Sequence, residues 1–147
     1  MIERQPTRAV TGILAGTAVA CYVAALFMPA HFEIGLDLGG GTYSGLECLT
    51  HPFIFPFIVM EYPSWFANPL WIGSLYCLWQ RIAKLATGLA ILAVLCVSLS
   101  HRDHRALPGY WLWGVSMVLA AFAALWELSS ARKYQFADAK RNPHNPL

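Results

Sequence analysis

Charged side chains are scarce in this sequence. Asp, Glu, Lys and Arg together make up 12% of its 147 residues, whereas a soluble domain carries about 25%. Hydrophobic residues account for 57%, so the chain lacks much of the polar surface that a water-soluble protein needs. This balance indicates an integral membrane protein. The net charge of +2, without a long basic patch, argues against a nucleic-acid partner.

Cysteine pairs are missing too. Cys21, Cys48, Cys77 and Cys96 stand apart, so the sequence has no zinc-type or redox-type pair. Only Cys48 falls in a predicted outer loop, and the others lie in apolar stretches, where Cys behaves as a small hydrophobe. This argues against a disulfide-shuttling membrane oxidoreductase, although Cys48 could pair with another chain.

Motifs for covalent or phosphoryl chemistry are absent as well. The sequence has no Gly-x-Ser-x-Gly elbow, no Walker-type Lys motif and no His-Glu-x-x-His pair. The run GLDLGGGTYSG, Gly35 to Gly45, resembles the phosphate-binding loop of actin-like ATPases. Those ATPases need a large two-lobed fold for which this chain has no room, and Tyr43 and Ser44 replace the acidic residue expected after Thr42. We therefore predict neither an enzyme nor a nucleotide site.

Apolar stretches long enough for helices dominate the rest of the chain. The sequence predicts an all-α membrane protein with four transmembrane helices in one domain, residues 1–147. The first apolar run follows Arg4 and Arg8. It exceeds the roughly 7–15 residues of a signal-peptide core, which favours a retained helix over a cleaved signal. The predicted segments are the spans 9–29, 68–81, 84–100 and 107–129, an outer loop at 30–66 and a cytoplasmic tail at 130–147.

Arg81 and Lys84 decide between three spans and four. One helix running through both would place them near the bilayer centre, where each charge costs about 2.5–3.5 kcal/mol. Three spans would also send the basic C-terminal tail outside, whereas four leave only Arg102 and Arg105 there. The positive-inside rule thus favours four spans with both termini cytoplasmic. The basic residues then inside are Arg4, Arg8, Arg81, Lys84, Arg132, Lys133, Lys140 and Arg141.

The outer loop carries a strand pattern. Apolar residues alternate with acidic or glycine residues from Phe32 to Leu38, which is the period of a half-buried strand. Gly39 to Gly41 can reverse the chain, and Thr42 to Cys48 can return as a second strand. We predict a short β-hairpin or irregular loop over the outer ends of the helices.

The second predicted span is short and follows a proline-rich approach. Three prolines between residues 52 and 63 disfavour one continuous helix, so Phe53 to Met60 is predicted as a short helix or half-inserted segment at the outer surface. Asn68 is predicted to cap the second span, with Pro69 at its first helical position.

Small side chains recur every four residues on the first span. Such a ladder lets another helix backbone approach closely. It could serve packing within the bundle or the docking of a partner membrane protein. The third span offers a similar seam from Ala83 to Ala93. The ladder of the first span consists of Gly12, Gly16, Ala20 and Ala24.

Tryptophans gather near the predicted span ends. Their amphipathic rings prefer the headgroup level of a membrane, so we predict that they act as interfacial anchors. The predicted anchors are Trp65, Trp71, Trp79, Trp111 and Trp126.

Ionisable residues are absent from the middle of the predicted spans, and Glu127 lies close to the end of the last one. Pumps and ion carriers need such groups along their path, which argues against a transporter but not against a small subunit of one. On the outer side, imidazole and carboxylate groups could bind zinc, copper or iron. No cofactor is predicted, and a metal, haem, quinone or pigment remains an alternative. The candidate metal ligands are His31, His51, His101 and His104.

Three segments carry a resemblance. They are YSGLECL (43–49), WFANPLWIGSLYCLWQRIAK (65–84) and LPGYWLW (107–113). Their Ala-Asn-Pro-Leu helix start, basic turn and late Gly-Tyr-x-Leu-Trp pattern resemble small bacterial four-helix inner-membrane proteins. The resemblance implies four-helix topology and a bacterial source, and it implies no activity.

Together these features predict a non-catalytic accessory or assembly subunit of a larger membrane complex. Its partners would be other membrane-protein subunits and the lipid bilayer. One alternative is a redox or metal-handling membrane protein that uses the outer histidines. Another is a small transporter component or an immunity-type membrane protein.

Overall fold

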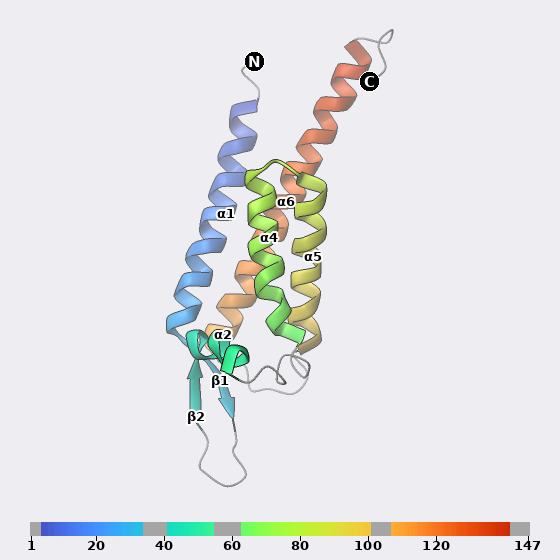
Figure 1. Cartoon of the computed structure of the whole chain (residues 1–147). Helices are drawn as coiled ribbons and strands as arrows, with labels where there is room; N and C mark the ends of the chain where they lie inside the picture. The colour runs from blue at the N-terminus through green and yellow to red at the C-terminus, as the bar shows by residue number, and fades with distance from the viewer. Residues whose placement is uncertain (1–3, 34–40, 55–62, 101–106, 142–147) are drawn as a thin grey trace.

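The long helices lie side by side along most of the molecule (Figure 1). The computed structural model describes residues 4–33, 41–54, 63–100 and 107–141, and within them the chain is mostly helical, with one short two-stranded sheet. The elements are α1 (Arg4–Phe27), β1 (Pro29–Glu33), β2 (Gly41–Ser44), α2 (Gly45–Ile54), η1 (Pro63–Phe66), α4 (Ala67–Trp79), α5 (Ala83–Ser100) and α6 (Pro108–Arg141).

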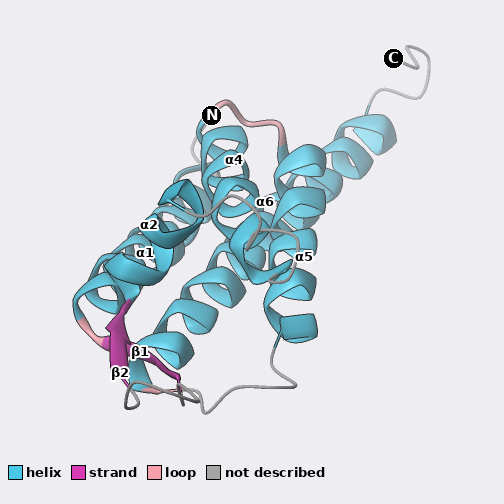
Figure 2. Cartoon of the chain, turned by 60° about the horizontal axis from the view of Figure 1, so that its bottom comes forward, coloured by secondary structure: helices cyan, strands magenta, loops and turns pink. Residues whose placement is uncertain are grey.

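The two ends of the bundle differ. The sheet and α2 lie at one end, which we call the hairpin end, and the described chain begins and finishes at the other, which we call the terminal end (Figure 1). Figure 2, turned so that the hairpin end comes forward, shows α2 over α1 and the two strands beside them. Beyond the α4–α5 turn, α6 continues through Arg141, so residues 130–141 of the predicted tail are helical.

Two helices could cross a membrane by their length and composition. They are Arg8–Phe27 of α1 and Pro108–Tyr134 of α6. A third apolar stretch, Ala83–Leu99 of α5, is shorter. These helices are consistent with the membrane location predicted from the sequence. Because α1 and α6 make the most extensive contact between any two elements, they form the framework on which the shorter α4 and α5 pack.

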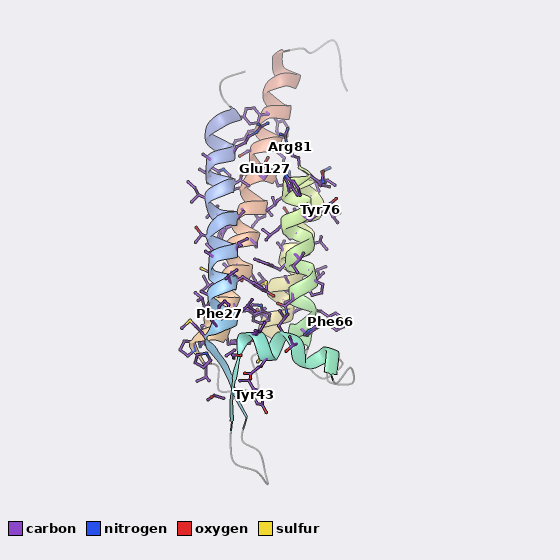
Figure 3. The ribbon with its side chains drawn as sticks, turned by 60° about the vertical axis from the view of Figure 1, so that its left-hand side comes forward. Phe27, Tyr43, Phe66, Tyr76, Arg81 and Glu127 are labelled. Atoms are coloured by element: carbon purple, nitrogen blue, oxygen red, sulfur yellow. The ribbon has the colours of Figure 1, made fainter. Side chains whose placement is uncertain are left out.

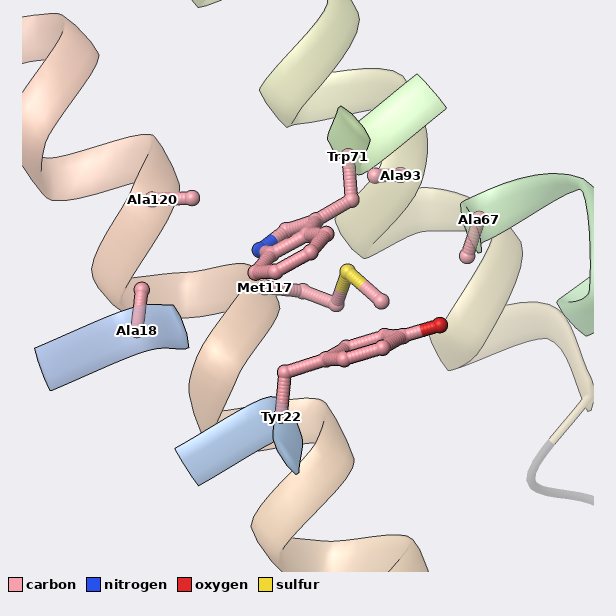
Figure 4. Packing of buried hydrophobic residues seen from close by; sticks show 7 residues of the cluster. All are labelled: Ala18, Tyr22, Ala67, Trp71, Ala93, Met117 and Ala120. Atoms are coloured by element: carbon pink, nitrogen blue, oxygen red, sulfur yellow. The ribbon is translucent and has the colours of Figure 1, made fainter. Parts of the chain in front are cut away.

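The core is built mainly from alanine. Ala18, Ala67, Ala93 and Ala120 are fully buried around one large aromatic pair and Met117 (Figure 4). Small side chains let helix backbones approach closely, which matters in lipid, where burial of apolar surface does not itself drive helices together. The seam predicted on the third span is part of this core, since the alanines at its last three positions, 86, 90 and 93, are fully buried.

A short hairpin closes the hairpin end. Strands β1 and β2 pair antiparallel, with Phe32 opposite Thr42, which confirms the predicted two-stranded element. The proposed Gly39–Gly41 turn lies mostly outside the described residues. The second strand is shorter than predicted, because it ends at Ser44 and α2 begins at the next residue. The prediction of a strand through Cys48 is therefore wrong.

A capping box explains that early helix start. The Glu47 carboxylate accepts hydrogen bonds from the Ser44 backbone N–H at 2.7 Å and from the Ser44 hydroxyl at 2.9 Å. In return, the Glu47 backbone N–H donates to the Ser44 hydroxyl at 3.3 Å. This Ser-x-x-Glu arrangement satisfies two free donors at a helix N-terminus, so it nucleates α2 where an extended chain was expected.

Two glycines let the hairpin press against the helices. The Gly45 N–H donates to the Met28 carbonyl at 3.0 Å, and a Cβ at Gly45 would collide with the Ala25 carbonyl oxygen. A Cβ at Gly109 would stand 2.8 Å from the Pro29 carbonyl oxygen. Only glycine fits at such distances from rigid backbone, so Gly45 fixes how α2 lies against the end of α1, and Gly109 fixes how α6 lies against the start of β1.

The predicted cap of the second span is wrong. Helix α4 begins at Ala67, directly after η1, and its cap residue Phe66 makes no side-chain hydrogen bond to the helix. Asn68 lies inside the first turn and uses its side chain elsewhere, as described below. Of the predicted short helix at Phe53 to Met60, residues 55–60 lie outside the described residues, and residues 53–54 are the end of α2.

The turn between α4 and α5 is a Schellman motif. The Arg81 N–H donates to the Leu78 carbonyl at 3.1 Å, and the Ile82 N–H donates to the Cys77 carbonyl at 2.8 Å. Arg81 has a φ of 62°, the left-handed conformation that this motif requires and that glycine usually supplies. An arginine in this conformation costs about 1–2 kcal/mol of backbone strain. The turn places its exposed charged side chain at the terminal end of the bundle.

Candidate functional site

The main polar feature of the bundle is a buried cluster that joins α1, α4 and α6. We call Tyr22, Asn68, Trp71, Trp113 and Ser116 the aromatic cluster. Asn68 is 8% exposed, and its Oδ1 accepts hydrogen bonds from the Tyr22 hydroxyl at 3.0 Å and from Trp113 Nε1 at 2.9 Å. One amide oxygen therefore links three helices.

The orientation of the Asn68 amide follows from its partners. Indole Nε1 is a donor only, so the atom that faces Trp113 must be the amide oxygen. The Nδ2 group then points elsewhere, and among the described residues nothing accepts a hydrogen bond from it. Asn68 thus acts as an acceptor inside the bundle.

Trp71 completes the aromatic cluster. Its ring stacks on Tyr22 with centroids 4.3 Å apart and planes 13° from parallel (Figure 4). Its Nε1 donates to the Ser116 carbonyl at 3.3 Å. Trp71 is only 5% exposed, so the prediction that it is an interfacial anchor is wrong. Because its indole N–H already donates to a carbonyl within the bundle, the ring does not need a polar partner at the membrane surface.

The remaining predicted anchors are more accessible. Trp79 is 80% exposed, and Trp111 and Trp126 are also exposed. Trp65 is half-buried, and its Nε1 donates to the Leu49 carbonyl at 3.3 Å, so it ties η1 to α2. Along α6, Trp111 and Trp126 are separated by about 22 Å at 1.5 Å per residue.

Most exposed aromatic side chains lie toward one end of the bundle or the other, and Phe122 is exposed between Trp111 and Trp126 on α6. Phe27 and Phe66 lie toward the hairpin end, and Tyr76 lies nearer the terminal end, below Arg81 (Figure 3). Two aromatic levels separated by an apolar middle are the pattern of interfacial belts in membrane proteins.

The small-residue ladder of α1 faces away from the rest of the bundle. The residues that α1 buries are Ala18, Tyr22 and Ala25, on the opposite side of the helix. A Cβ added at Gly12 or Gly16 would meet nothing within 4 Å. Among the described residues, no other element therefore packs on the Gly12 and Gly16 positions of the ladder. The four ladder residues, all exposed, are Gly12, Gly16, Ala20 and Ala24.

Near the terminal end, α1 and α6 share one polar contact. The Thr11 hydroxyl donates to a Glu127 carboxylate oxygen at 2.9 Å. The sequence predicts that Glu127 lies close to the end of the last span. Because α6 continues to Arg141, Glu127 lies inside the helix. It lies at the level of the Arg81 turn (Figure 3), and its half-buried side chain holds the two longest helices in register.

The pKa values of two titratable groups of α2 shift in opposite directions. Hydrogen bonds from the backbone and side chain of Ser44 lower the pKa of the Glu47 carboxyl. Burial, followed by the neighbouring Glu47 charge, raises the pKa of the Cys48 thiol. Because the thiolate is the reactive form, Cys48 is a poor nucleophile at neutral pH.

The described residues do not test the predicted metal site. His31 lies in β1 and His51 in α2, while His101 and His104 lie outside the described residues. Among the residues that the structure describes, no three His, Cys, Asp or Glu side chains are grouped as metal ligands. The groups that do converge are the amide, indoles and phenol of the aromatic cluster, which form hydrogen bonds and stack.

These features describe a helical protein with two helices able to cross a membrane. The aromatic cluster joins three of its helices through buried hydrogen bonds. Comparison with protein-family models, with curated proteins and with solved structures found no match to this chain.

Proposed function

We propose that this chain is a non-catalytic inner-membrane protein of four spans that acts as an accessory or assembly subunit of a larger membrane complex. The observation that carries the proposal is the exposed ladder of α1. A helix whose small-residue face is left open by its own bundle offers a partner helix a close approach of backbones. The indole N–H groups and the hydroxyls of the aromatic cluster, by contrast, donate hydrogen bonds within the chain.

The lengths of the helices support four spans. Helix α5 has 18 residues, which at 1.5 Å each gives about 27 Å. Helix α4 alone gives about 20 Å from 13 residues. The four residues of η1 that precede it add about 8 Å at 2.0 Å each. Both segments then approach the hydrocarbon thickness of about 30 Å.

The charges support cytoplasmic termini. The exposed Arg81 and Lys84 flank the α4–α5 turn, and Arg132 and Lys133 are exposed on α6 at the same end of the bundle. The positive-inside rule places this end in the cytoplasm. The hairpin and α2 then lie on the outer face.

A bulky residue in the ladder tests the docking role. Gly16→Leu fills the α1 face without touching the rest of the chain, since a Cβ there has open space. Blue native electrophoresis of membranes solubilised in mild detergent should show a complex for the wild type and at least a tenfold loss of it for Gly16→Leu. The matched control is Gly88→Leu on α5, where a Cβ also meets nothing within 4 Å.

The control separates association from folding. Both variants replace a helical glycine by a better helix former, so both should purify as folded chains with unchanged helical circular dichroism. Gly88→Leu should retain the complex. A wild-type chain that migrates only as a stable monomer, or a Gly16→Leu complex as abundant as that of the wild type, contradicts the proposal.

A further inference from the structure

An apolar groove runs between α5 and α6 on the side of the bundle. It encloses about 460 Å³, within the range of about 300–1,000 Å³ typical of small-ligand sites. Its α5 wall includes Val94 and Val97, and its α6 wall includes Gly114 and Val118, while Met117 of the core also lines it. The α1 ladder contributes nothing to this groove.

The lining of the groove is mainly apolar. Its side chains with polar groups are Ser98, Tyr110 and Trp111. The Ser98 hydroxyl donates to the Val94 carbonyl at 2.9 Å, and the Tyr110 hydroxyl donates to the Val97 carbonyl at 3.0 Å. Because both hydroxyls already donate along α5 and most of the lining is aliphatic or aromatic, the complementary occupant is a hydrocarbon.

The length of the groove matches an extended hydrocarbon chain. From Tyr110 to Phe122, the limits of the α6 wall, the groove extends about 18 Å at 1.5 Å per residue. One leaflet of hydrocarbon is about 15 Å deep, half of the roughly 30 Å core. The groove therefore matches one leaflet in length and lies along α6, as an acyl chain would.

We infer that this groove holds one acyl chain of a membrane phospholipid. The inference rests on the membrane placement proposed above, which sets Trp111 at the outer interface. Gly114 keeps the groove open, because a Cβ there would stand 3.8 Å from Val97 Cγ1 and a longer side chain would extend into the space. The lipid acts as a fixed part of the α5–α6 wall.

Native mass spectrometry of protein purified in mild detergent and reconstituted with phosphatidylglycerol tests the inference. The wild type should retain one phospholipid per chain through extensive washing. Gly114→Leu should reduce that retention at least tenfold, while the control Gly88→Leu, away from the groove, should retain the lipid like the wild type. Circular dichroism and size-exclusion profiles confirm that each variant folds.

Three results would overturn the inference. They are equal retention by Gly114→Leu and Gly88→Leu, release of phospholipid from the wild type on washing, and a retained mass that matches an isoprenoid quinone or a peptide. Complex formation on blue native gels is measured with the same variants. Because Gly114→Leu leaves the α1 ladder intact, its complex should persist, so failure of the lipid site and failure of the docking role give different patterns.

Discussion

Asn68 accepts two of the hydrogen bonds that join the helices. Its amide oxygen accepts from both Tyr22 and Trp113, so Asn68→Leu leaves two buried donors without their acceptor. Hydrogen bonds between membrane helices contribute about 0.6 kcal/mol on average and up to about 1.7 kcal/mol. We therefore predict that Asn68→Leu lowers the free energy of unfolding by about 1–3 kcal/mol, measured by SDS titration of the protein in mixed micelles.

The control for this prediction is Tyr22→Phe. It removes one of the two hydrogen bonds and keeps the ring that stacks on Trp71, so its effect should be smaller than that of Asn68→Leu. If Asn68→Leu is as stable as the wild type, the aromatic cluster does not join the helices energetically.

The close contact between α6 and β1 fixes the position of the hairpin relative to the helices. A Cβ at Gly109 would lie 2.8 Å from the Pro29 carbonyl oxygen and 2.9 Å from that of Met28. Backbone cannot move aside as a side chain can, so Gly109→Ala should lower the free energy of unfolding by about 1–3 kcal/mol.

Gly114→Ala on the same helix is the matched substitution. Its Cβ would make an ordinary contact of 3.8 Å with Val97 Cγ1, and alanine in a helix is more favourable than glycine by about 0.5–1 kcal/mol. Thermal unfolding in detergent should rank Gly114→Ala at or above the wild type and Gly109→Ala below it. The reverse order would show that β1 does not press against α6.

The sequence predicts features that depend on neighbouring residues, and it misses those that depend on contacts between helices. Hydropathy and alternation depend only on neighbouring residues, and they predicted the helical character and the two-stranded element. The Ser44-x-x-Glu47 cap is equally local. It ends the second strand at Ser44, whereas alternation alone predicts that the strand continues. Trp71 was assigned to the interface and Asn68 to a helix cap because their partners, Tyr22, Trp113 and Ser116, lie on other helices. No spacing along the chain reveals such contacts.

The orientation of the whole molecule is the last expectation, and single cysteines can test it. In a chain whose native cysteines are replaced by alanine, three exposed positions mark the compartments. Thr42→Cys lies at the hairpin end, Gln80→Cys at the α4–α5 turn and Arg132→Cys on α6 beyond that turn. With four spans, a membrane-impermeant maleimide should label Thr42→Cys in intact spheroplasts, and Gln80→Cys and Arg132→Cys only after permeabilisation.

Three spans make a different forecast for the same variants. Gln80 would then lie within the hydrocarbon, where maleimide does not reach it before or after permeabilisation, and Arg132 would be labelled from outside. Arg132→Cys is therefore the deciding position, because the two topologies place it in opposite compartments. Labelling of Arg132→Cys in intact spheroplasts would contradict four spans, and it would also remove the positive-inside balance that favours a cytoplasmic Arg81 turn.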